Sequence, residues 1–182
     1  MTSHAIAFLA TAVLTATPLL SADWPQWRGA GRVGHSPDTS ILAPWPKSGP
    51  KQAWVFKDAG IGYSSFSIVG TRLFTMGARQ QSEQVICLDA TTGKELWATS
   101  LGPVYENNWG DGPRSTPTVD GDHLYALSAT GILACLNIKD GTEVWKVDVV
   151  KSLGGELQGW GYTESVLIDG DHVICTPGGQ QG

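Results

Sequence analysis

Two stretches of the sequence combine aromatic side chains with carboxylates and amides, which are residue types that bind flat ligands or hard cations. The first stretch contains Glu106, Asn107 and Trp109, and the second contains Glu156 and Trp160. Carboxylate and amide oxygens suit Ca²⁺, and tryptophan offers a flat apolar face. Both stretches also carry a Trp-Gly pair, which serves equally in packing between repeats, and the sequence favours this simpler interpretation. The five residues are therefore weak candidates for a cofactor-binding site.

Other patterns that could do chemistry lack the context that the chemistry needs. Residues 29–34 match G-x-G-x-x-G, but a dinucleotide fingerprint must follow an apolar strand and open a helix. Here Trp-Pro-Gln-Trp-Arg precedes the glycines and a proline follows them, so we interpret residues 29–34 as part of a loop packed on the domain surface. The three cysteines, Cys87, Cys135 and Cys175, form no CxxC or adjacent pair, and we expect all three to be buried apolar side chains. Catalytic residues remain unknown, and no metal ligands can be assigned.

The composition indicates an all-β protein that does not bind nucleic acid. The chain has 182 residues, a formal net charge of −5, 23 glycines and only 16% charged residues. Short strands joined by glycine-rich turns fit that composition better than long surface helices do. Nucleic-acid binding needs a basic stripe, which a net acidic chain without Lys or Arg runs does not provide.

The elements that must position the candidate residues are repeats. Residues 87–97 read Cys-Leu-Asp-Ala-Thr-Thr-Gly-Lys-Glu-Leu-Trp, and residues 135–145 keep Cys, Leu, Gly, Glu and Trp at the same offsets. Each copy is predicted to be a strand, a tight turn at Gly93 or Gly141, and a second strand ending in Trp97 or Trp145. A repeat of about fifty residues is typical of stacked units that bury their apolar faces against each other.

The repeats divide the chain into segments. An apolar stretch with small residues before Asp23 predicts a signal peptide at 1–22, with an uncleaved anchor as the alternative, followed by a Trp/Pro-rich extension at 23–50. The repeat region covers 51–182, with a strand at 51–57, two complete four-stranded units at 64–100 and 115–150, and a partial unit at 163–182. The strand at 51–57 resembles the last strand of a unit, so we expect it to close a ring by pairing with strands beyond Gly182. Without that partner, we expect the 182-residue chain alone to be poorly soluble or partly unfolded.

The turn-and-tryptophan element resembles the docking motif A-x-D-x-x-T-G-K-x-x-W of the quinoprotein (PQQ-like) β-propeller family. The first copy matches at Asp89, Thr92, Gly93, Lys94 and Trp97, with Cys87 at the alanine position. The second copy keeps Gly141 and Trp145, with Asn137 in place of the aspartate. The resemblance implies an incomplete β-propeller of about two and a half four-stranded antiparallel blades. In such a fold Trp97 and Trp145 would fill the wedges between neighbouring sheets.

The resemblance also implies two functions. One is an exported, periplasmic or extracellular BamB-like scaffold that is non-catalytic and holds a protein partner or small ligand on its loop face. The other is the N-terminal part of a PQQ- and Ca²⁺-dependent alcohol dehydrogenase. Every motif present is structural, so we expect the scaffold, with no cofactor assigned, no nucleic-acid partner and no integral membrane segment after signal cleavage.

Overall fold

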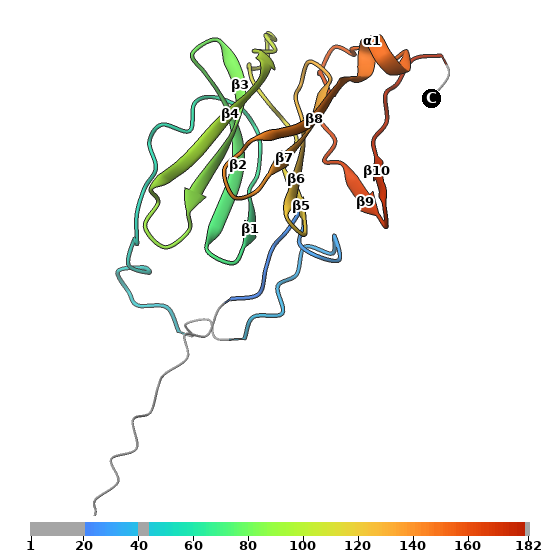
Figure 1. Cartoon of the computed structure of the whole chain (residues 1–182). Helices are drawn as coiled ribbons and strands as arrows, with labels where there is room; N and C mark the ends of the chain where they lie inside the picture. Colours follow the sequence, from blue (N-terminus) through green and yellow to red (C-terminus); the bar gives the residue numbers. More distant parts are fainter. Residues whose placement is uncertain (1–20, 40–43, 181–182) are drawn as a thin grey trace, which may run out of the picture.

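Two four-stranded antiparallel sheets stand side by side in the computed structural model, which describes residues 21–39 and 44–180 (Figure 1). The first sheet has the order β1-β2-β3-β4, and the second has the order β5-β6-β7-β8. The first sheet contains β1 (Ser67–Val69), β2 (Arg72–Arg79), β3 (Ser82–Asp89) and β4 (Glu95–Pro103). The second contains β5 (Thr118–Asp120), β6 (His123–Leu127), β7 (Ile132–Asn137) and β8 (Glu143–Asp148). Each sheet is a meander of consecutive strands, as expected for a propeller blade.

A third, two-stranded sheet follows the second blade. It pairs β9 (Leu167–Asp169) with β10 (His172–Ile174), and the predicted partial blade therefore forms a hairpin. The helix α1 (Val149–Leu153) precedes it and was not predicted, because five residues are too few to show a helical period. The carboxylate of Asp148 caps this helix by accepting from the amides of Val150 and Lys151, and Gly154 ends it at φ 67°.

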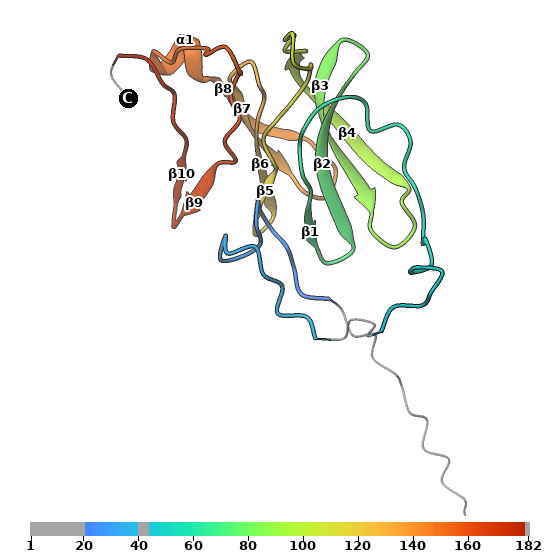
Figure 2. The ribbon, with the colours of Figure 1, turned by 180° about the vertical axis from the view of Figure 1, so that it is seen from behind.

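The apolar core lies between successive blades, and Figure 2 shows the same stacking from behind. The first cluster joins Phe74 and Val85 of the first blade to Leu124 and Leu136 of the second. The second cluster lies between the second blade and the hairpin, and contains Leu127, Leu133, Val149, Tyr162 and Val166. The innermost strands are neighbours, with β1 next to β5 and β5 next to β9. The stacked units therefore bury faces that none of them could bury alone.

The docking tryptophans join each unit to the turn of the next. The indole of Trp97 donates to the carbonyl of Ile138 at 3.2 Å, and a side chain at Gly141 would collide with its ring. Trp54 makes the equivalent contacts with the turn of the first blade. Its indole donates to the carbonyl of Ala90 at 2.9 Å, and a side chain at Gly93 would collide with its ring. Both glycines have positive φ and leave room for the indole. Trp145 differs, because among the described residues no such turn covers it and it is 39% exposed.

The segment 51–57 differs from the predicted strand. It forms no strand and pairs with none among the described residues. Trp54 in this segment still makes the docking contact of an outer strand, the bond from its indole to the carbonyl of Ala90. This contact needs only the indole and does not require pairing between strands. The expected ring closure concerns strands outside this chain and stays a prediction. At the other end of the first blade, β4 runs to Pro103 and so extends past the predicted boundary at residue 100.

The prediction that all three cysteines are buried is wrong for Cys175. Cys87 and Cys135 lie in the middle strands β3 and β7 and are 0% and 1% exposed. Cys175 follows β10, in a sheet with only two described strands, and is half-buried. Burial raises the pKa of the Cys87 thiol to about 12 and also raises the pKa of Cys135 and of Cys175, so the three thiols differ mainly in exposure.

We expect this difference to control thiol reactivity. Because reaction needs an accessible thiol, an alkylating reagent at pH 8 should label Cys175 of the folded 182-residue chain faster than Cys87 and Cys135, which should stay unmodified until the chain is unfolded. Mass spectrometry of tryptic peptides after timed alkylation measures all three sites in one sample. Labelling of Cys87 or Cys135 as fast as Cys175 would contradict the packing of the two middle strands.

Most of the predicted signal peptide at 1–22 lies outside the described residues, so the structure does not test it. Within residues 21–39 and 44–180, none of the helices has the length and apolar character required to span a membrane.

Candidate binding site on the loop face

The two predicted aromatic stretches meet at one end of the blades. Trp109 lies in the loop between β4 and β5, and Trp160 lies in the loop that follows α1. Their rings stack with centroids 4.6 Å apart and an interplanar angle of 23°, within the range of favourable aromatic pairs. Trp109 is 68% exposed and Trp160 is 56% exposed. The stack, here called the tryptophan pair, therefore presents a large apolar surface to solvent.

Hydrogen bonds between the same two loops hold the tryptophan pair in place. The amide of the Asn107 side chain donates to the carbonyl of Gly159 at 2.5 Å, and the Tyr105 hydroxyl donates to the same carbonyl at 2.9 Å. The Asn107 side-chain oxygen also accepts from the backbone amide of Trp109 at 2.9 Å. Asn107 thus orders its own loop and joins it to the next one.

Arg114 and Tyr63 extend this surface toward the first blade. The Arg114 guanidinium lies over the rings of Tyr105 and Tyr63, 4.9 and 5.5 Å from their centroids. It also donates to the carbonyls of Gly110 and Gly112 at 2.6 Å each. The Tyr63 hydroxyl donates to the carbonyl of Trp109 at 2.8 Å. The loops 58–63, 102–114 and 151–163 therefore form one connected surface, as expected for the loop face of a propeller.

A buried carboxylate, Glu83, supports the loop face from below. Its side chain is 0% exposed at the start of β3. One oxygen accepts from the backbone amide of Tyr105 at 3.1 Å, and the other accepts from that of Ala129 at 2.8 Å. Burial raises the pKa of Glu83, while these two amides and the positive charge of Arg114 oppose the shift. Glu83 therefore joins the loop of the first blade to the second blade.

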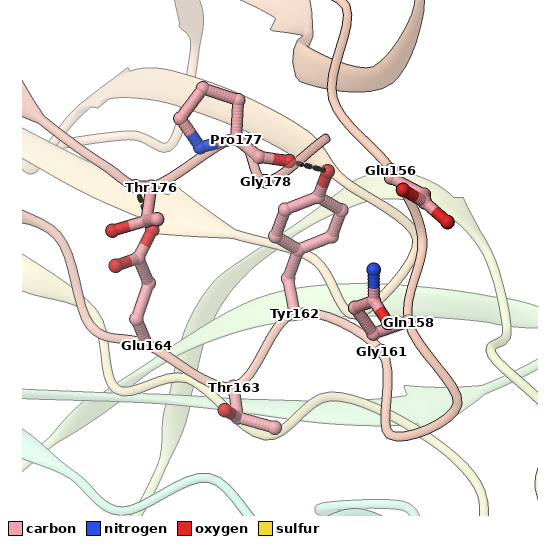
Figure 3. Close-up of a pocket in the computed structure, with 9 residues that line it drawn as sticks. All are labelled: Glu156, Gln158, Gly161, Tyr162, Thr163, Glu164, Thr176, Pro177 and Gly178. Carbon is pink, nitrogen blue, oxygen red and sulfur yellow. Dashed lines mark hydrogen bonds between the residues drawn. The ribbon is translucent and has the colours of Figure 1, made fainter. Parts of the chain in front are cut away.

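A small hollow lies beside the third loop (Figure 3). It has a volume of about 270 Å³, and Glu156, Tyr162, Glu164 and Pro177 are among the residues that line it. The Tyr162 hydroxyl donates to the carbonyl of Pro177 at 2.6 Å, and Glu164 accepts from the amide of Thr176. These bonds attach the third loop to the residues that follow β10.

The structure brings together three of the five candidate residues, namely Asn107, Trp109 and Trp160. The side chains of Glu106 and Glu156 are exposed on the same loops. Within the described part of the chain, no group of three or more His, Cys, Asp or Glu residues could hold a metal ion. Sequence reasoning missed Glu83, Arg114 and Tyr63. For Arg114 and Tyr63 a signal was available, because Arg and Tyr in the loops are residue types that are enriched at protein interfaces.

The comparisons with known proteins concern the repeat region. The family model described as outer membrane protein assembly factor BamB matches residues 51–182. A comparison with curated proteins finds no match.

Two solved structures resemble part of the chain. BamB from Moraxella catarrhalis is 21% identical, with a TM-score of 0.32 over 42% of this chain and 20% of that one. A europium-containing methanol dehydrogenase is 20% identical, with a TM-score of 0.49 over 68% of this chain and 22% of that one. The chain thus spans between 20% and 22% of the length of each of these proteins.

Proposed function

The chain belongs to the PQQ-repeat family of the outer membrane protein assembly factor BamB, and from this premise we propose that it is part of an exported, non-catalytic scaffold that binds a protein partner. The partner binds the loop face, and the tryptophan pair is the centre of the contact. The family is that of an assembly factor for outer membrane proteins, which supports a role outside the cytoplasm.

The single observation that carries this proposal is an ordered and exposed aromatic surface. Trp, Tyr and Arg are the residues most often found as energetic centres of protein interfaces. Here Trp109, Trp160 and Tyr63 are exposed, and cross-loop hydrogen bonds hold the tryptophan loops in position. A surface that is ordered before binding loses less entropy when a partner docks. The nearby carboxylate Glu83 is occupied by backbone amides, so it serves the architecture of the loops.

A cofactor assay separates this proposal from the dehydrogenase alternative. The full-length protein is incubated with PQQ and Ca²⁺, and reduction of an artificial electron acceptor is followed with a series of alcohols. The scaffold proposal predicts no turnover above that of heat-denatured protein. Turnover that requires both PQQ and Ca²⁺ would overturn the proposal and establish the alternative.

The tryptophan pair should matter for binding and not for folding. Replacing both Trp109 and Trp160 with alanine is expected to weaken partner binding about thirtyfold or more, since interface centres contribute about 2 kcal/mol or more. The free energy of unfolding should change little because both rings are exposed. Co-purification from the native envelope followed by titration of the recovered partner measures the first effect, and denaturant unfolding measures the second.

Trp45 provides the matched control. It is 66% exposed, close to the 68% of Trp109, but it lies in the N-terminal extension, whose part at 44–50 Figure 1 shows at the end of the blades opposite α1. Trp45→Ala should leave partner binding unchanged. Equal losses of binding in the Trp45 variant and the double variant would show that the tryptophan pair has no special role.

A further inference from the structure

The Trp/Pro-rich extension packs on the domain, as the sequence predicted, and its first residues run along the innermost strands of the blades. Trp24 and Ile68 of β1 form an antiparallel bridge, with N–O distances of 2.7 and 2.8 Å in the two directions. The carboxylate of Asp23 accepts from the amide of Gly70, in the turn after β1, at 2.8 Å. The segment therefore pairs with the exposed inner edge of the first blade. Figure 1 shows it in blue below β1 and β5.

The next residue bonds to the next blade. The carbonyl of Pro25 accepts from the amide of Val119 in β5 at 2.8 Å. Proline has no amide hydrogen, so it suits a position where only a carbonyl is used. Two consecutive residues, Trp24 and Pro25, thus bond to the innermost strands of two different blades. Main-chain pairing of this kind is how extended peptides add to a free sheet edge.

The third contact comes from Arg32 and reaches the hairpin. Its guanidinium donates to the carbonyls of Val166 at 2.5 Å and Ser165 at 3.2 Å, immediately before β9. The hydroxyl of Thr118 in β5 donates to the same Val166 carbonyl at 2.9 Å, so the second and third units meet at this atom. Gln26 orients the guanidinium by accepting from Arg32 Nε at 2.9 Å.

The glycines at 29–34 make this path possible. Gly29 has φ 80° and is buried, and a Cβ there would lie 2.9 Å from the Trp24 ring. Gly34 has φ 70° and donates its amide to the carbonyl of Arg28 at 2.9 Å. The pattern that resembles a dinucleotide fingerprint therefore lets the chain fold back so that Trp24 and Arg32 both face the inner strands.

We propose that the inner edges of β1 and β5, with the residues before β9, form a binding surface for an extended peptide, and that its occupant is the chain's own segment 23–34. This segment acts as a clasp that fixes three successive units relative to one another around the axis of the ring. The clasp also positions the loop face, because Thr116, next to the loop that carries Trp109, bonds to Ser165 in the unit that Arg32 holds.

Hydrogen exchange in the full-length protein tests the clasp directly. The amides of Ile68 and Val119 donate to the clasp, whereas the amide of Val85 belongs to the interior strand β3 and reports global unfolding. One variant lacks residues 23–34, and a second carries Trp24→Ala and Arg32→Ala. In both, the amides of Ile68 and Val119 should lose protection while Val85 keeps it. A synthetic peptide of residues 21–36, added in trans to the deletion variant, should restore protection of both amides.

Three outcomes would overturn the proposal. Ile68 and Val119 could stay protected in the double point variant while Val85 is also protected. The added peptide could fail to restore protection of Ile68 and Val119 in a deletion variant whose protected Val85 amide shows that it is folded. A peptide with alanine at positions 24 and 32 could restore protection equally well, which would show that the clasp side chains do not select the occupant. If the deletion alone unfolds the protein, the double point variant decides the result.

Discussion

Replacing Trp97 with alanine is expected to lower the free energy of unfolding of the full-length protein by about 3–5 kcal/mol, as for other large aromatic truncations in packed regions. The indole lies between the two blades, donates to the carbonyl of Ile138 and packs against Phe74 with ring centroids 5.9 Å apart. Its removal leaves a cavity between the blades and an inter-blade hydrogen bond unmade. Chemical denaturation monitored by far-UV circular dichroism measures the change.

The neighbouring residue is the matched control. Leu96 alternates with Trp97 along β4 and is 44% exposed, so Leu96→Ala should cost under about 1 kcal/mol. A loss of similar size in the Trp97 variant would mean that the indole is not the wedge between the blades. Trp145→Ala should cost less than Trp97→Ala in this chain, because Trp145 is partly open to solvent.

Replacing Glu83 with alanine is expected to cost about 2–4 kcal/mol of stability, because one buried and one partly buried amide lose their acceptor, and a fully buried amide without an acceptor costs about 1–3 kcal/mol. The amides concerned are those of Tyr105 and Ala129, which belong to different blades. Denaturant unfolding at pH 7 measures the loss. Glu106→Ala is the control, since this exposed glutamate of the same loop should contribute within about 0.5 kcal/mol. Equal effects at the two positions would show that Glu83 does not join the loops.

The same residue gives a prediction for pH dependence. The pKa of Glu83 is raised by burial, so the folded protein binds this proton more tightly than the unfolded chain does. Its contribution to stability is therefore fully present below the ordinary glutamate pKa and is lost as the pH rises through the raised pKa. Glu83→Gln has no proton to lose, and its stability should improve relative to wild type over that range. A relative gain by wild type would show that the amides and Arg114 outweigh burial.

The repeat pattern predicted the architecture because it is set by local chemistry. Gly93 and Gly141 are required because their turns pack against the indoles of Trp54 and Trp97. The fixed spacing from Gly93 to Trp97 and from Gly141 to Trp145 predicts where the two outer strands, β4 and β8, begin. The family assignment rests on the same residues and agrees with the match over 51–182. Alternating side chains then determine which strand faces are buried.

The sequence could not predict contacts that depend on how blades stack. Trp109 and Trp160 were placed in successive loops, but their 4.6 Å separation follows from the packing of one blade on the next. Glu83 reads as an ordinary polar residue beside Gln84, and it is buried only because the backbone amides of Tyr105 and Ala129 converge on it. The clasp depends on main-chain hydrogen bonds between distant segments, and such bonds leave almost no trace in side-chain patterns.

Site-specific photo-crosslinking in the native envelope tests the central claim, that the loop face binds a protein partner. A photoreactive amino acid is placed at position 109 or 160 of the full-length protein, and at position 45 as the exposed control. The scaffold account predicts one discrete crosslinked protein from positions 109 and 160 that is absent from position 45. The account would be contradicted if all three positions gave the same crosslinking pattern. It would also be contradicted if positions 109 and 160 gave no crosslinked protein and the protein showed PQQ-dependent turnover.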